Sequence, residues 1–153
     1  MKRPVVEAHL ALTIDGKLAG REKSALESFR WRRTDALLTQ KKPGPIPAAP
    51  RVVVWKRSDE LREALVVLAR DHGVRRVICG GEPALLKALV EQELLSHLHV
   101  VFSPVVAGGA RNPTLLGPAA TALLPRSVAL KLEHFSAAGE HPRATYRVIV
   151  AKK

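Results

Sequence analysis

The chain has 153 residues, of which 46% are hydrophobic and 25% charged, which fits one folded domain and excludes an intrinsically disordered chain. It carries 25 Lys and Arg against 14 Asp and Glu, a formal net charge of +11, which favours anionic partners such as nucleic acids, phosphorylated metabolites or dinucleotide cofactors. The single cysteine, Cys79, excludes an intrachain disulfide, and no stretch is apolar enough to span a membrane. We therefore expect one cytoplasmic domain over residues 1–153, with Cys79 as a small buried thiol.

The first predicted element is a strand over residues 5–13, which a polar turn ends. A basic helix of modest amphipathicity over 23–33 and a short strand over 35–39 follow it. Residues 43–50 then contain four prolines. Because proline lacks an N–H and has a fixed φ, this segment is predicted as a stiff, extended connection.

Two strand–helix units come after this connection. The first consists of a β-branched strand over 51–55 and a helix with Ser58 as the expected N-cap and Gly73 as its end. The second consists of an apolar strand over 74–79 and a helix with Pro83 in its first turn. Both helices repeat their leucines at helical spacing, which predicts one apolar face on each.

A strand over 98–102 completes the second unit. Parallel neighbours need crossover connections of about a dozen residues, so these units predict a parallel sheet with helices packed on it. Residues 128–135 and 145–150 alternate on either side of a polar segment, which predicts an antiparallel hairpin at the sheet edge. The predicted fold is therefore α/β, a mostly parallel sheet flanked by helices with a C-terminal antiparallel hairpin.

Three turns at predicted strand ends carry residues that suit an anion site. The clearest is the strand–helix junction at residues 80–83, Gly-Gly-Glu-Pro, where backbone amides and the positive end of a helix dipole would face an anion. The others are residues 13–17, Thr-Ile-Asp-Gly-Lys, and residues 107–111, Ala-Gly-Gly-Ala-Arg. Each motif alone also fits a tight turn that uses glycine for steric reasons and binds no ligand. Because the carboxyl ends of parallel strands meet at one edge, we expect all three to line one crevice.

Other site classes find less support in the sequence. His97 and His99 share a strand face but have no Cys, Asp or Glu at typical ligand spacing beside them, so no metal site is predicted. The chain has no Gly-x-Ser-x-Gly motif for a nucleophilic serine. The basic stretch 21–33 leaves nucleic-acid binding open as a less favoured alternative, although few aromatic side chains are available to stack on bases.

Three segments together resemble the pyrimidine reductase family of riboflavin biosynthesis, namely residues 11–19 (ALTIDGKLA), 80–86 (GGEPALL) and 103–109 (SPVVAGG). Their order and placement agree with that family, the C-terminal domain of bifunctional deaminase–reductases, over most of the chain. The resemblance implies a dihydrofolate reductase-like fold and a homodimer. It also implies an NADPH-dependent reduction of a phosphoribosylaminopyrimidine, in which hydride reaches C1 of the ribose and opens it to a ribityl chain.

The resemblance also implies roles for individual residues, with Asp15 and Lys17 as catalytic residues beside a small phosphorylated pyrimidine or pterin-like substrate. The residues expected to bind NADPH are Thr13, Gly80, Gly81, Glu82, Ala84, Leu85, Gly108 and Gly109. Where the family has a glycine-rich segment with paired aspartates, this chain has Asp35 followed by Lys41, Lys42 and the proline-rich connection, so part of the cofactor region is shortened. A second hypothesis therefore stays open, a catalytically inactive homologue that binds a nucleotide or acts as an assembly partner.

Overall fold

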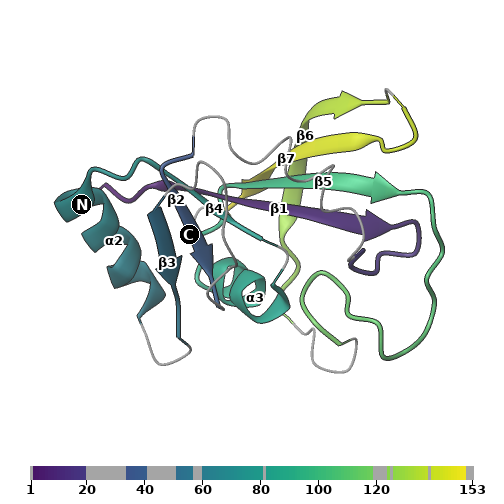
Figure 1. Ribbon diagram of the computed structural model, residues 1–153, viewed down its shortest axis with the longest axis horizontal. Coiled ribbons are helices and arrows are strands. Elements are labelled where there is room, and N and C mark those ends of the chain that lie inside the picture. The colour runs from purple at the N-terminus through teal and green to yellow at the C-terminus, as the bar shows by residue number, and fades with distance from the viewer. Residues whose placement is uncertain are drawn as a thin grey trace.

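The computed structural model describes residues 2–19, 34–40, 51–56, 60–80, 82–118, 124, 126–137 and 139–150. Its strands are β1 (Val5–Thr13), β2 (Ala36–Thr39), β3 (Arg51–Val54), β4 (Arg76–Cys79), β5 (His97–Ser103), β6 (Ala129–Ser136) and β7 (Arg143–Ile149). They form one sheet in the order β3-β2-β4-β1-β5-β7-β6 (Figure 1). The first five strands are parallel, and β6 and β7 join antiparallel at one edge. The predicted α/β class and the C-terminal hairpin are thus confirmed.

Two described helices, α2 (Leu61–His72) and α3 (Pro83–Glu91), pack against the same face of the sheet. This face forms the core because alternate strand residues are apolar and point toward the helices. The buried strand side chains in it are Val6, Ala8, Leu10, Ala36, Leu38, Val77, Cys79, Leu98 and Val100. Cys79 is fully buried, as expected. Neither of these two helices has the length and apolarity that a membrane crossing requires.

Local signals located the helix ends with one exception. Gly73 caps the C-terminus of α2 with a left-handed φ of 64°, and Pro83 is the first residue of α3, both as predicted. The N-cap prediction was wrong, because α2 begins at Leu61 with Glu60 as its N-cap and no side-chain capping bond. The fully buried Leu61 side chain packs in the core, which supports this boundary without a capping hydroxyl. Ser58 lies outside the described residues.

The remaining strand ends differ from the predicted ranges by no more than two residues. The predicted helix over 23–33 and the proline-rich connection over 43–50 lie outside the described residues.

Candidate active site at the carboxyl edge of the sheet

The three bends that the sequence indicates meet at one edge of the sheet. The turn after β1 contacts the loop over residues 104–118, where the Ile14 N–H donates to the Val105 carbonyl at 2.9 Å. Farther along this loop, Gly117 approaches the start of α3 so closely that an added Cβ would lie 3.8 Å from Cβ of Pro83. In Figure 1 the loop leaves the end of β5 in green and curls beside the end of β1 in purple. The bends therefore form one continuous rim.

Asp15 ties the turn after β1 to this loop. Its Oδ1 accepts hydrogen bonds from the Thr13 hydroxyl (2.7 Å) and the Ala107 N–H (3.0 Å), and its Oδ2 accepts one from the Gly108 N–H (2.7 Å). The Thr13 hydrogen bond, followed by those from Ala107 and Gly108, lowers the pKa of Asp15 to about 2. At neutral pH Asp15 is an ionised anchor for the loop, and its predicted catalytic role stays a prediction.

The hydrogen bonds of Asp15 should depend on pH in a way that can be measured. Because the pKa of Asp15 is lowered to about 2, its contribution is fully present above the ordinary aspartate pKa of about 4 and is lost as pH falls through about 2. We expect the amide proton signals of Ala107 and Gly108 to titrate together with a midpoint near pH 2 in NMR spectra. Asp15→Asn, the matched control, should abolish this titration. A midpoint near pH 4 in the wild type would contradict the hydrogen-bonded anchor.

Thr13 and Lys17 close the same turn from its two ends. The Thr13 N–H donates to the Lys17 carbonyl (2.8 Å), and the Lys17 N–H donates to Oγ1 of the buried Thr13 (3.0 Å). The Thr13 hydroxyl is thus engaged within the turn. Lys17 is a half-buried residue that takes part through its main chain, and no carboxylate among the described residues forms an ion pair with its side chain. Its ammonium is the positive charge that this turn carries.

The start of α3 supplies the second predicted part of the site. Its first intrahelical bond runs from the Leu86 N–H to the Glu82 carbonyl at 2.9 Å, so the amides of Ala84 and Leu85 have no acceptor within the helix. Glu82 is the N-cap residue but makes no side-chain capping bond. The Leu85 side chain is fully buried, which leaves its amide as the group that could contact a ligand. Such amides fit an anionic phosphate.

The carboxylate of Glu82 has another role. It joins the end of β2 to the start of α3, because Oε1 accepts from the Thr39 hydroxyl (2.5 Å) and Oε2 accepts from the Gln40 N–H (2.6 Å). A carboxylate held in this way ties one bend of the rim to the end of β2, but its negative charge does not attract a phosphate. Gly80 directly follows β4 at this junction, and Gly81 lies outside the described residues.

The two predicted glycines of the third bend are required by its shape. Gly108 and Gly109 have φ values of 60° and 80°, which favour glycine, and an added Cβ on Gly109 would lie 3.3 Å from Nδ2 of Asn112. The Gly108 amide donates to Asp15, and its carbonyl accepts from Nδ2 of Asn112 at 2.6 Å. The loop is therefore held in shape from inside.

An apolar hollow of about 140 Å³ lies away from the rim, between the end of α3 and the C-terminal hairpin of β6 and β7. Val90, Glu93, Arg126 and Val148 are among its lining residues. Ligand pockets for drug-sized molecules measure about 300–1,000 Å³. This hollow is thus too small for a dinucleotide, and the rim remains the better candidate because charges and unbonded amides converge there.

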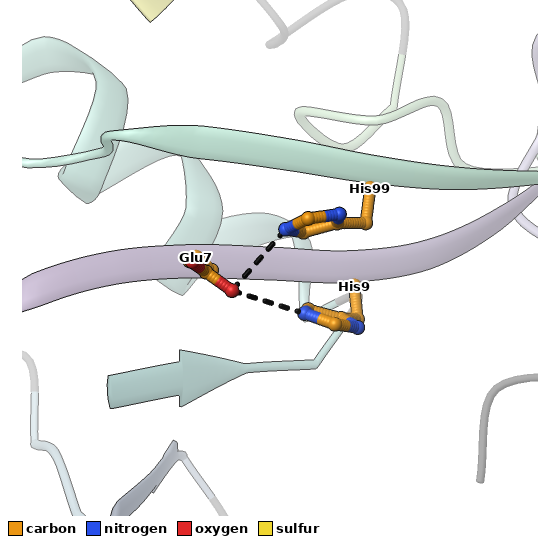
Figure 2. A group of neighbouring side chains, drawn as sticks. All are labelled: Glu7, His9 and His99. Carbon is orange, nitrogen blue, oxygen red and sulfur yellow. Dashed lines mark hydrogen bonds and ion pairs between the residues drawn. The ribbon is translucent and has the colours of Figure 1, made fainter. Parts of the chain in front are cut away.

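A buried polar cluster that was not predicted from the sequence lies on the sheet face opposite α2 and α3. Glu7 and His9 of β1 are 6% and 3% exposed, and His99 of β5 lies beside them because His9 pairs with His99 in the register. Figure 2 shows both imidazoles pointing at one carboxylate oxygen. Burial raises the pKa of Glu7, but the His9 and His99 imidazoles and the Arg76 guanidinium more than offset this and hold the pKa well below its usual range.

The acidic partner of His99 comes from a distant part of the sequence. No acidic residue stands beside His99 in the sequence, but β1 brings Glu7 to it from 92 positions away, with His99 Nε2 and Glu7 Oε2 3.2 Å apart. The alternating Glu7-x-His9 and His97-x-His99 patterns are visible in the sequence. The pairing of β1 with β5 was the missing information.

Comparison with known proteins agrees with this architecture. The family model of the RibD C-terminal domain matches residues 32–141, which is more than half of the chain. Among curated proteins no relative matches.

Solved structures place the fold. RibD of Acinetobacter baumannii superposes with a TM-score of 0.71 at 14% identity, covering 97% of this chain and 59% of that one. The riboflavin biosynthesis reductase Rib7 of Saccharomyces cerevisiae gives 0.68 at 11% identity, covering 97% and 90%. Dihydrofolate reductase from Enterococcus faecalis, complexed with NADP(H), gives 0.56 at 14% identity, covering 94% and 96%. The fold is dihydrofolate reductase-like, and with the match over residues 32–141 the chain belongs to the RibD C-terminal domain family.

Proposed function

We propose that this protein is an NADPH-dependent reductase that acts on a small phosphorylated pyrimidine of the 5-amino-6-(5-phosphoribosylamino)uracil type. The observation that carries the proposal is the convergence of the turn after β1, the loop over 104–118 and the start of α3 at one rim. Membership of the RibD C-terminal domain family supports the reaction class. A cytoplasmic protein with one domain over residues 1–153 is part of the same proposal.

The residues at the rim fit a polyanionic dinucleotide. The Ala84 and Leu85 amides and the positive end of α3 would hold a phosphate group. The net charge of +11 adds a long-range attraction for such a ligand. NADPH, when bound, supplies the hydride, whereas the protein binds and orients both molecules.

The turn after β1 would hold the substrate. The Lys17 ammonium, which no described carboxylate neutralises, would bind the substrate phosphate or stabilise negative charge that develops during reduction. Asp15 keeps the loop over 104–118 against this turn, and the same loop approaches the start of α3, so Asp15 would help to hold the parts of the rim together. Asp15 thus acts here as a positioning residue.

Two measurements test the proposal in sequence. Calorimetric titration with NADPH should show saturable binding, and absorbance at 340 nm should then fall when the pyrimidine substrate is added. NADH, titrated in the same way, shows whether the ribose 2′-phosphate contributes to affinity. Failure to bind either cofactor at millimolar concentration would reject a reductase.

One observation favours the inactive homologue as a second candidate. The carboxylates of Asp15 and Glu82, the two acidic residues of the predicted site, are both engaged in hydrogen bonds within the protein. This candidate predicts saturable NADPH binding without oxidation for any pyrimidine or dihydrofolate substrate. The same two measurements therefore separate the candidates.

A homodimer is part of the proposal, and β6 offers the surface for it. Leu130, Leu132 and Phe135 of this edge strand are 44%, 51% and 54% exposed, and all three continue the apolar sheet face beyond the helices. A second copy of the chain would cover these side chains.

Sedimentation measures this association directly. We expect the wild type to sediment as a dimer and Leu132→Gln to raise its dissociation constant at least tenfold, because a buried apolar contact is lost. Lys131→Gln, the adjacent residue on the opposite face of the same strand, should leave it unchanged. A wild type that is monomeric at every concentration would exclude the dimer.

A further inference from the structure

The cluster of Glu7, His9 and His99 lies outside the rim and has no part in the proposed reduction. It sits on β1 and β5, with side chains that are 8%, 4% and 13% exposed in that order. The Nε2 atoms of both histidines face Oε2 of Glu7, at 3.6 Å from His9 and 3.2 Å from His99 (Figure 2). All three donor atoms lie within 4.8 Å of one another.

We propose that Glu7, His9 and His99 form a binding site for a divalent transition-metal ion of the Zn²⁺ type. Two imidazole nitrogens and one carboxylate oxygen are a donor set that Zn²⁺ takes in proteins, and the fourth position would hold a water molecule. Donors at about 2.0–2.1 Å from a tetrahedral ion lie about 3.3 Å apart. The observed separations of 3.2 and 3.6 Å between Oε2 and the two nitrogens are close to this value.

The separation between His9 and Glu7 also fits a shared ion. Nε2 of His9 lies 3.6 Å from Oε2 of Glu7, a gap that one ion bound to both atoms would bridge. The rings of His9 and His99 lie 4.3 Å apart between centroids, so both approach the carboxylate from neighbouring strands. The parallel register of β1 and β5 fixes that approach.

The surroundings of the cluster match those of a metal site. Nδ1 of His99 lies 3.0 Å from Oγ1 of Thr145, so an Nδ1–H can donate to this hydroxyl while Nε2 keeps its lone pair for the ion. On the other side, Nη1 of Arg76 binds Oε1 of Glu7 at 3.1 Å, which leaves Oε2 facing the imidazoles. Each of these contacts orients one ligand. His99 is the most exposed of the three side chains.

Co²⁺ is the spectroscopic probe for this site. Titration of the EDTA-treated, dialysed full chain should give one equivalent of bound Co²⁺ with visible d–d absorption of four- or five-coordinate strength. In ¹⁵N spectra, one equivalent of Zn²⁺ should move the Nε2 resonances of two of the six histidines and place the proton of His99 on Nδ1. Zn²⁺ should also raise the melting temperature, because it binds the folded chain.

Paired variants assign the ligands. His99→Gln should weaken Co²⁺ binding at least 30-fold, whereas His97→Gln should change it less than threefold. His97 is the matched control, since it lies on the same strand face with its ring 6.3 Å from that of His99 but pairs with Glu133 (3.4 Å). Thr145→Val, which removes the partner of Nδ1, should weaken binding about tenfold.

Several outcomes would overturn the proposal. These are no Co²⁺ absorption from the wild type at 100 μM metal, an equal loss in His97→Gln and His99→Gln, or Zn²⁺-dependent shifts confined to other histidines. If His99→Gln does not fold, the wild-type ¹⁵N spectra decide the question alone. NADPH titration of the metal-free chain keeps this test separate, since loss of the metal site leaves the rim intact.

Discussion

Lys17→Met is expected to lower kcat/KM for the pyrimidine substrate by about 10²–10³-fold, the usual effect of removing one group that stabilises developing charge. The Lys17 ammonium is the positive charge of the turn after β1. Its removal should leave the turn intact, because the turn uses the main chain of Lys17, which hydrogen-bonds to Thr13 in both directions. Steady-state oxidation of NADPH, followed at 340 nm, measures the effect.

Lys87→Met is the matched control for this substitution. Its ammonium lies 3.7 Å from Glu91 within α3, so the variant loses the same charge away from the turn. We expect kcat/KM to stay within threefold of the wild type. If both variants lose activity equally, net charge and not position decides the rate. If neither does, Lys17 is a solvated turn residue and another group holds the substrate.

Local sequence signals predicted the elements well where one residue decides the geometry. Gly73 ends α2 because it adopts a left-handed φ. Pro83 begins α3 because the first position of a helix needs no N–H donor, and proline has none. The start of α2 was different. Ser58 has the side chain of an N-cap, but the helix begins where Leu61 reaches the core, so tertiary packing overrides the capping preference.

The candidate site could be predicted as a place but not as a set of contacts. The turn at Asp15 and Gly16 and the loop at Gly108 were visible, and the topology of a parallel sheet brings them to one edge. The partners of Asp15 were not visible, because Ala107 and Gly108 lie more than 90 positions away in the sequence. The resemblance implies a catalytic role for Asp15, which stays a prediction, and the structure adds that its carboxylate holds a loop.

The same limit applies to the histidine cluster. Whether Glu7 faces His97 or His99 depends on side-chain direction as well as register, since Glu7 pairs with His97 across the strands but its carboxylate reaches His99. The cation that balances the charge of Glu7 could not be predicted either, because the Arg76 guanidinium that binds it comes from β4. Composition and spacing carry no information on these distances.

Leu85→Ala is expected to lower the free energy of unfolding by about 2–5 kcal/mol, because it opens a cavity in the core without removing a polar group. The Leu85 side chain is fully buried, and it belongs to the first turn of α3, where the proposed phosphate-binding amides lie. Ile14→Ala removes the same number of carbon atoms from a side chain that is 67% exposed at the same rim. It should cost less than about 1 kcal/mol. Urea denaturation measures both values.

NADPH affinity of the same pair of variants separates stability from binding. Leu85→Ala keeps the amide that would contact the phosphate, so its dissociation constant for NADPH should stay within threefold of the wild type under conditions where the variant is folded. A large loss of affinity with a small loss of stability would mean that the Leu85 side chain contacts the ligand, contrary to its burial. Equal destabilisation by Leu85→Ala and Ile14→Ala would mean that the first turn of α3 does not pack on the sheet. In that case nothing would hold the amides at the rim, and the phosphate site would lose its physical basis.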